Sequence, residues 1–167
     1  PRGKKPNMNF DTLGLSAPIC QAVAANLARI GVKVNLTAET KNTYFPKILR
    51  RDTSFYLLGW TPGTYDSHNA LIGVMASPAD KGQGQFNLGS YSNPRLDELT
   101  LKVQGETDQA KRNAMIREAL LRTRDEFLYV PLHHQLRPWA MKKGVTTTHR
   151  ADDRPEARFT SVNPGGS

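Results

Sequence analysis

Five side chains that could hold a small molecule lie close together in the stretch LLGWTPGTYDSHNAL. Trp60 and Tyr65 offer aromatic walls, while Asp66, His68 and Asn69 offer a carboxylate, an imidazole and an amide. Aromatic walls with a few polar groups that fix orientation are typical of a small-molecule pocket. The same residues are equally consistent with a core tryptophan followed by an aspartate that caps a helix.

A second candidate for chemistry is the segment GLSAP, which is similar to the Gly-x-Ser-x-Gly nucleophile elbow and lies between a predicted strand and a predicted helix. Pro18 replaces the second glycine, and a proline there more simply indicates a helix start behind a Ser16 cap. Asp66 with His133 or His149 would complete the order Ser, Asp, His along the chain. A serine hydrolase of α/β type that uses Ser16 therefore stays open as an alternative.

Metal coordination is weakly indicated. His133 and His134 are adjacent, so in an extended segment they point to opposite faces. Asp66 and His68 could form a pair of ligands, but no third ligand recurs at a helical or hairpin spacing. The single Cys20 excludes an internal disulfide and a cysteine-based zinc site. We therefore expect no metal site.

The composition favours a soluble globular protein. The 167 residues are enough for one domain with a real core, and 38% of them are hydrophobic. The net charge is +8, but the 23 Lys and Arg residues are interleaved with 15 Asp and Glu residues, which indicates a basic solvated surface. A basic nucleic-acid-binding domain remains a further alternative. No apolar run approaches the length of a membrane span, and the opening PRGKKPNMNF shows no signal peptide.

The first part of the chain predicts a parallel sheet. Strands are expected in MNFDTLGL, VKVNL and SFYLLGW, with helices in SAPICQAVAANLARIG and TYFPKILRR, the latter with Pro46 tolerated only near its start. SFYLLGW is apolar on both faces, as in a strand at the middle of a covered parallel sheet. Ligands bind beyond the carboxyl ends of such strands, where the loop opens at Thr61.

The remainder is predicted to be mostly helical. Helices are expected in SHNALIGVMAS, with Asp66 or Ser67 near the N-cap, in NPRLDELTLKVQ and in TDQAKRNAMIREALLRTRDEF. Ile116, Leu120 and Phe127 are expected to line one face of the last helix. The extended segment YVPLHHQLRPWAM is expected to close the sheet as an edge strand, because it contains prolines.

Five segments in this order resemble the family 5 extracellular solute-binding proteins: ICQAVAANLARIGVKVNL, YLLGWTPGTYD, NLGSYSNPRLDEL, ETDQAKRNAMIREAL and YVPLHHQLRPWAMKKGV. The resemblance implies an α/β fold with a mostly parallel sheet flanked by helices, as in one lobe of a two-lobe type II periplasmic binding protein. Residues 1–148 would be the C-terminal part of the second ligand-binding lobe. Residues 149–167 would be a tail that crosses back to the first lobe.

The resemblance also implies a function. Such proteins are the substrate-binding components of ABC importers, and they deliver a peptide-like or other small solute to a membrane permease. It implies no catalytic residue and no cofactor, and a periplasmic or extracellular, membrane-associated location. A fragment of such a protein would expose an apolar surface where the other lobe packs, and would tend to self-associate.

The resemblance places the ligand at the loop from Trp60 to Asn69. Trp60 corresponds to a tryptophan near the ligand, and three residues later peptide-binding relatives carry an aspartate that pairs with the peptide's ammonium group. Here that position is Gly63. Either Asp66 takes over that role, or the ligand has no free amino terminus. The residues expected to bind ligand are Trp60, Thr61, Gly63, Tyr65, Asp66, His68 and Asn69.

Overall fold

The chain folds as two units. The computed structural model describes residues 6–136, 138–150 and 152–163. The first unit is the chain up to Trp60 together with Leu88–Ser90. The second unit is Thr61–Asn87 together with the chain from Tyr91 onward.

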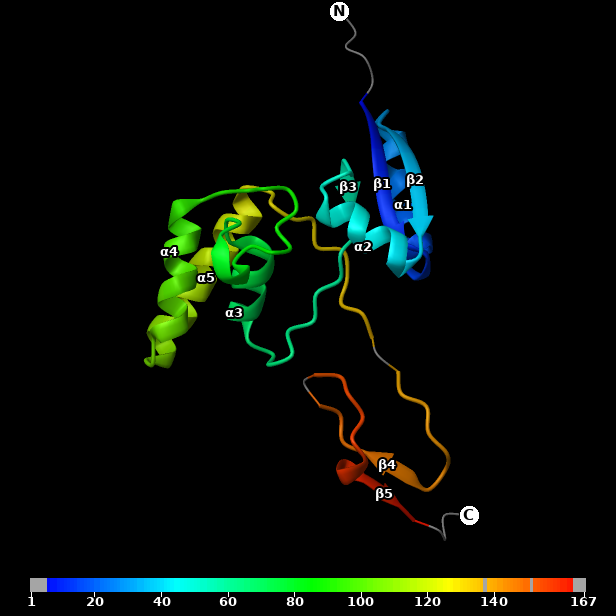
Figure 1. The fold of residues 1–167 in the computed structure, drawn as a ribbon, viewed down its shortest axis with the longest axis vertical. Helices are drawn as coiled ribbons and strands as arrows, with labels where there is room; N and C mark the ends of the chain where they lie inside the picture. Colours follow the sequence, from blue (N-terminus) through cyan, green and yellow to red (C-terminus); the bar gives the residue numbers. More distant parts are fainter. Residues whose placement is uncertain (1–5, 137, 151, 164–167) are drawn as a thin grey trace, which may run out of the picture. The chain divides into compact units, whose positions relative to one another are not determined.

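A three-stranded parallel sheet organises the first unit (Figure 1). Its elements in chain order are β1 (Asn7–Leu13), α1 (Ala17–Arg29), β2 (Lys33–Glu39), α2 (Lys41–Leu49) and β3 (Phe55–Tyr56). The strand order is β2-β1-β3, so β1 is the central strand of the described sheet. The parallel sheet with its helices confirms the predicted α/β class.

The core of the first unit forms between α2 and the chain around β3. Tyr44 and Ile48, one turn apart on α2, are completely buried and pack with Leu88, which is 8% exposed. The Tyr44 hydroxyl also donates to the carbonyl oxygen of Leu57 at 2.5 Å. Leu88 belongs to the short stretch Leu88–Ser90, where the chain returns to the first unit. A residue distant in the sequence therefore completes this core.

Two expectations for the first unit are wrong in detail. The predicted central strand SFYLLGW forms only Phe55–Tyr56 and lies at the edge of the described sheet, because β1 takes the central place. Pro46 is the sixth of nine residues in α2 rather than near its start. Burial of Tyr44 and Ile48 on either side of Pro46 outweighs its poor helix propensity.

A buried ion pair lies on the central strand. Asp11 of β1 is fully buried, and Lys47 donates to its Oδ1 at 2.7 Å while Thr53 donates to its Oδ2 at 2.6 Å. The hydrogen bond to Asp11 raises the pKa of Lys47. Both carboxylate oxygens therefore have a donor, as a buried charge requires.

The second unit is helical at its centre. Its elements are α3 (Ser67–Ala70), a π-helical turn (Leu71–Met75), α4 (Pro94–Gly105), α5 (Gln109–Asp125), β4 (Val145–Thr147) and β5 (Thr160–Val162). Helices α4 and α5 lie side by side (Figure 1) and enclose a core of Leu71, Leu96, Leu99 and Ala119. No helix in the described residues has the length and apolar character needed to cross a membrane.

Side-chain caps begin the α-helices α3, α4 and α5 of this unit. Asp66 accepts from the backbone of α3, Asn93 from that of α4 and Asp108 from that of α5. These contacts satisfy N–H groups that have no partner within the helix. The predicted helix starts are confirmed, with Asp66 rather than Ser67 as the cap of α3.

The predicted face of α5 is partly wrong. Ile116 packs against the core, but Leu120 is 37% exposed and Phe127 is 84% exposed. The buried positions are Ala119 and Thr123. The helix ends at Asp125, so helical spacing no longer applies to Phe127.

The predicted edge strand in YVPLHHQLRPWAM does not form. The described residues of this segment, 129–136 and 138–141, join no sheet. Pro131 and Pro138 have no N–H to donate to a neighbouring strand. Further on, β4 and β5 pair antiparallel, so the predicted tail contributes a strand to a small hairpin.

Candidate functional site

The predicted ligand loop begins where the first unit ends. The chain leaves β3 through Leu57, whose N–H still bonds to the carbonyl oxygen of Asp11 at 3.2 Å, and reaches a half-buried Trp60. Thr61 then opens the second unit. The predicted site residues are therefore divided, with Trp60 in one unit and the rest in the other.

The exposed tip of the loop is a tight turn. The N–H of Tyr65 bonds to the carbonyl oxygen of Pro62 at 3.2 Å, and the N–H of Asp66 bonds to Oγ1 of Thr64 at 3.3 Å. Tyr65 has a φ of 55° and is 75% exposed. A bulky residue in the left-handed region is strained, and such strain is found preferentially at functional sites.

Gly63 stands in open space within this turn. A Cβ built on it would meet no atom within 4 Å, and the residue is exposed. No steric demand of the described structure therefore requires a glycine at this position.

Asp66 forms the base of the loop. Its Oδ1 accepts from the N–H of His68 at 2.8 Å, and its Oδ2 accepts from Nη2 of Arg112 at 2.8 Å. Both hydrogen bonds lower the pKa of Asp66, and the bond from the N–H of His68 has the larger effect. Asp66 is therefore ionised at neutral pH and already has a cationic partner within its own unit.

The imidazole of His68 ties the start of α3 to α4. Its Nε2 lies 3.1 Å from the carbonyl oxygen of Thr100, which is buried on α4. His68 and Asn69 are half-buried, and the N–H of Asn69 bonds to the carbonyl oxygen of Asp66 at 3.1 Å. The structure thus brings these three predicted residues together, at the base rather than the tip of the loop.

Sequence reasoning missed Arg112, the cation that Asp66 contacts. It lies 46 residues further along the chain, on α5, and its Nε also donates to the carbonyl oxygen of Val103 at 3.2 Å. Nothing in the local spacing around Arg112 distinguishes it from the other arginines of α5. Only the packing of α5 beside α4 reveals the pair.

The residues of the predicted hydrolase are not assembled within either unit. Ser16 lies in the first unit at the start of α1, where its side chain makes no capping hydrogen bond. Asp66, His133 and His149 belong to the second unit. Asp66 is held by Arg112, and the ring of His149 lies 4.8 Å from that of Trp139. Among the described residues, no group of three His, Cys, Asp or Glu side chains could hold a metal ion.

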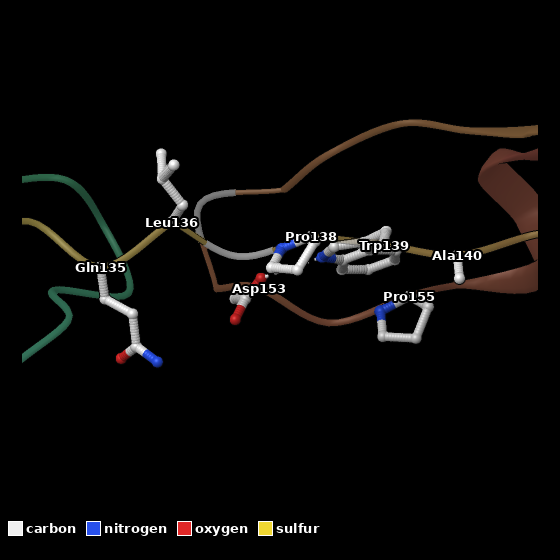
Figure 2. Close-up of a pocket in the computed structure, with 7 residues that line it drawn as sticks. All are labelled: Gln135, Leu136, Pro138, Trp139, Ala140, Asp153 and Pro155. Carbon is white, nitrogen blue, oxygen red and sulfur yellow. Dashed lines mark hydrogen bonds between the residues drawn. The ribbon is translucent and has the colours of Figure 1, made fainter. Parts of the chain in front are cut away.

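A shallow hollow of about 450 Å³ lies elsewhere in the second unit (Figure 2). In it, Nε1 of Trp139 donates to Oδ1 of Asp153 at 3.3 Å. Its lining contains none of the predicted ligand residues: Gln135, Leu136, Pro138, Trp139, Ala140, Asp153 and Pro155. Figure 2 shows the side chain of Leu136 directed away from Asp153.

Comparison with known proteins identifies relatives across nearly the whole chain. No protein-family model matches. The chain is 27% identical over 156 residues to the nickel-binding periplasmic protein of Escherichia coli strain K12, covering 92% of this chain and 29% of that protein. It is 26% identical over 142 residues to the oligopeptide-binding protein OppA of Bacillus subtilis strain 168, covering 84% of this chain and 25% of that protein.

The fold has a close counterpart among solved structures. The Escherichia coli murein tripeptide binding protein MppA matches with a TM-score of 0.79 at 17% identity, over 97% of this chain and 32% of that chain. The structural neighbours are type II periplasmic binding proteins, and the homologues are family 5 solute-binding proteins. The chain spans less than a third of the length of the curated relatives described above.

Proposed function

We propose that this homologue of the family 5 solute-binding proteins is part of the substrate-binding component of an ABC importer, and that it binds a peptide-like or other small solute. The observation that carries the proposal is the similarity to two named binding proteins over 92% and 84% of the chain. Their names differ in the solute, nickel in one and oligopeptide in the other.

We also propose a partner and a location for this protein. The solute would enter between two lobes, and its higher affinity for the closed arrangement would drive closure. A membrane permease would then receive it, in the periplasm or at the outer face of the membrane. The chain would act without catalysis and without a cofactor, since the relatives are named as binding proteins.

Within this chain, the segment from Trp60 to Asn69 is the proposed ligand loop. Thr61, Gly63 and Tyr65 are exposed at its tip, and the ring of Tyr65 is available to pack against a solute. Asp66, His68 and Asn69 support the tip from below.

The test is to identify small molecules that co-purify with the complete polypeptide that carries this chain. After mild purification, denaturation and mass spectrometry of the released fraction, we expect a stoichiometric peptide or similar small solute. Isothermal titration with trialanine, glutathione and the nickel–histidine complex would then compare the solute classes. No bound solute, together with no heat of binding for any probe, would contradict the proposal.

A further inference from the structure

The proposed ligand loop is fastened to the helices of its own unit by two side chains. Arg112 of α5 bonds through Nη2 to Oδ2 of Asp66, and His68 bonds to the carbonyl oxygen of Thr100 on α4. Asp66 and His68 are joined in turn by a 2.8 Å hydrogen bond. The end of the loop that follows Tyr65 is thus held to both long helices.

Arg112 is itself well held. It bonds to the carbonyl oxygen of Val103 through Nε, and its side chain is only 20% exposed. The side chain of Asp66 is 37% exposed. A guanidinium fixed at two points is a more rigid partner than an exposed lysine, because its donors are planar and preorganised. Arg112 therefore has a contact with Val103 that does not depend on Asp66.

Asp66 is the only acidic residue between Thr61 and Asn69. Both of its oxygens have a donor, one neutral and one cationic. A ligand ammonium placed against this carboxylate would have to compete with Arg112 and would be repelled by it. The loop therefore offers no acidic group that is not already engaged by its own unit.

Resting on the proposed function, we propose that Arg112 is a positioning residue that holds the ligand loop through Asp66. In this arrangement Asp66 stabilises the loop and does not pair with a cationic group of the solute. The solute would then meet the tip of the loop through uncharged contacts with Tyr65 and the backbone of Thr61 and Gly63. Arg112 would affect affinity without touching the solute.

The first arm of the test measures the loop without any ligand. Hydrogen exchange followed by mass spectrometry is compared for the complete polypeptide and its Arg112→Met, Arg112→Lys and Asp66→Asn variants. Asn caps helices about as well as Asp, so Asp66→Asn removes the charge but keeps the bond to His68. Arg117→Met is the control, since Arg117 is an exposed arginine on the same helix.

We expect exchange in the peptide covering residues 61–70 to become about tenfold faster in Arg112→Met and Asp66→Asn, as the loss of a charge-assisted hydrogen bond predicts. The double variant should be no faster than either single variant, because the two residues act as one unit. Arg112→Lys should restore part of the protection. Unchanged exchange in Arg112→Met would overturn the proposal.

The second arm measures affinity for trialanine and N-acetyltrialanine by titration. We expect Arg112→Met and Asp66→Asn to weaken both probes by the same factor, with no added loss in the double variant. A loss confined to trialanine in Asp66→Asn, with Arg112→Met unaffected, would identify Asp66 as a counter-charge for the solute and overturn the proposal. If neither probe binds the unmodified protein, peptide binding in the proposed function fails, and the exchange arm decides the positioning role.

Discussion

Lys47 and Asp11 form an ion pair across 2.7 Å in which the aspartate side chain is 1% exposed and the lysine side chain is 23% exposed. The pair is therefore unequal: Lys47 can reach water and also lies 3.7 Å from Glu39, whereas Asp11 depends on Lys47 and Thr53. Removing the lysine leaves a buried charge, while removing the charge of the aspartate does not.

From this asymmetry we expect Lys47→Met to lower the free energy of unfolding by about 3 kcal/mol, toward the lower bound for a broken buried pair. Asp11→Asn should cost less, and Asp11→Asn combined with Lys47→Met should recover part of the loss. Urea denaturation of the complete polypeptide measures all three. Equal costs for the two single variants would show that the burial of Asp11 does not control the pair.

The stability contributed by Asp66 should depend on acid pH. Its pKa is lowered below the ordinary value of 3.8, so the ionised form adds stability above that value and the gain is lost as the pH falls through the lowered pKa. We expect the Tm difference between the protein and Asp66→Asn to be constant from about pH 7 to about pH 5, and to shrink below about pH 4. Thermal scans across this range measure it. A difference that grows on acidification contradicts the assignment.

Tyr65 should contribute to solute binding more than to folding. Tyr65→Ala is expected to weaken binding of the co-purifying solute by about tenfold or more with little change in Tm, since exposed aromatic residues dominate binding surfaces. Phe127→Ala is the matched control, because Phe127 is 84% exposed with a φ of 52°, against 75% and 55° for Tyr65. Equal effects of the two variants would remove Tyr65 from the proposed ligand loop.

Substitution of Gly63 tests whether the amino terminus of a peptide ligand binds near this turn. Gly63→Asp introduces a carboxylate into open space, so we expect normal folding. The ratio of affinities for trialanine and N-acetyltrialanine should rise by about tenfold, as a new charge pair predicts. Gly63→Asn, of the same shape without charge, should leave the ratio unchanged. A ratio that does not move in Gly63→Asp would place the amino terminus of the peptide away from this turn.

The isolated chain should self-associate through the exposed apolar residues that follow Tyr129. Val130, Leu132 and Leu136 are 66%, 42% and 89% exposed and lie within seven residues of one another. Contiguous exposed apolar side chains promote association between molecules, because association removes their surface from water. Sedimentation velocity should show mass increasing with concentration, and Val130→Lys with Leu136→Lys should suppress the increase. A chain that stays monomeric at all concentrations contradicts this expectation.

The elements that could be predicted from the sequence are those whose signals are local. The cap at Asp66 and the starts of α4 and α5 follow from a capping residue beside a helical pattern. The edge position of β3 could not be predicted, because an apolar run does not reveal which neighbour takes the centre of a sheet. The strand predicted in residues 129–141 does not form in the described part of that segment, where Pro131 and Pro138 have no N–H for a neighbouring strand.

The composition of residues 60–69 predicts a ligand loop, and its role stays a prediction. What the sequence could not provide is the division within it, with Tyr65 at an exposed tip and Asp66 in a fixed base. Arg112, which contacts Asp66 in that base, is 46 residues away along the chain. Pair interactions of this kind become visible only when two helices are placed side by side.

Leu88 has a consequence for how this polypeptide can be divided. It completes the core beside Tyr44 and Ile48, although the chain has already entered the second unit at Thr61. A gene cut after Trp60 would therefore produce a first unit with an unfilled apolar hollow. A chimaera that exchanges this unit therefore has to exchange Leu88–Ser90 along with residues up to Trp60.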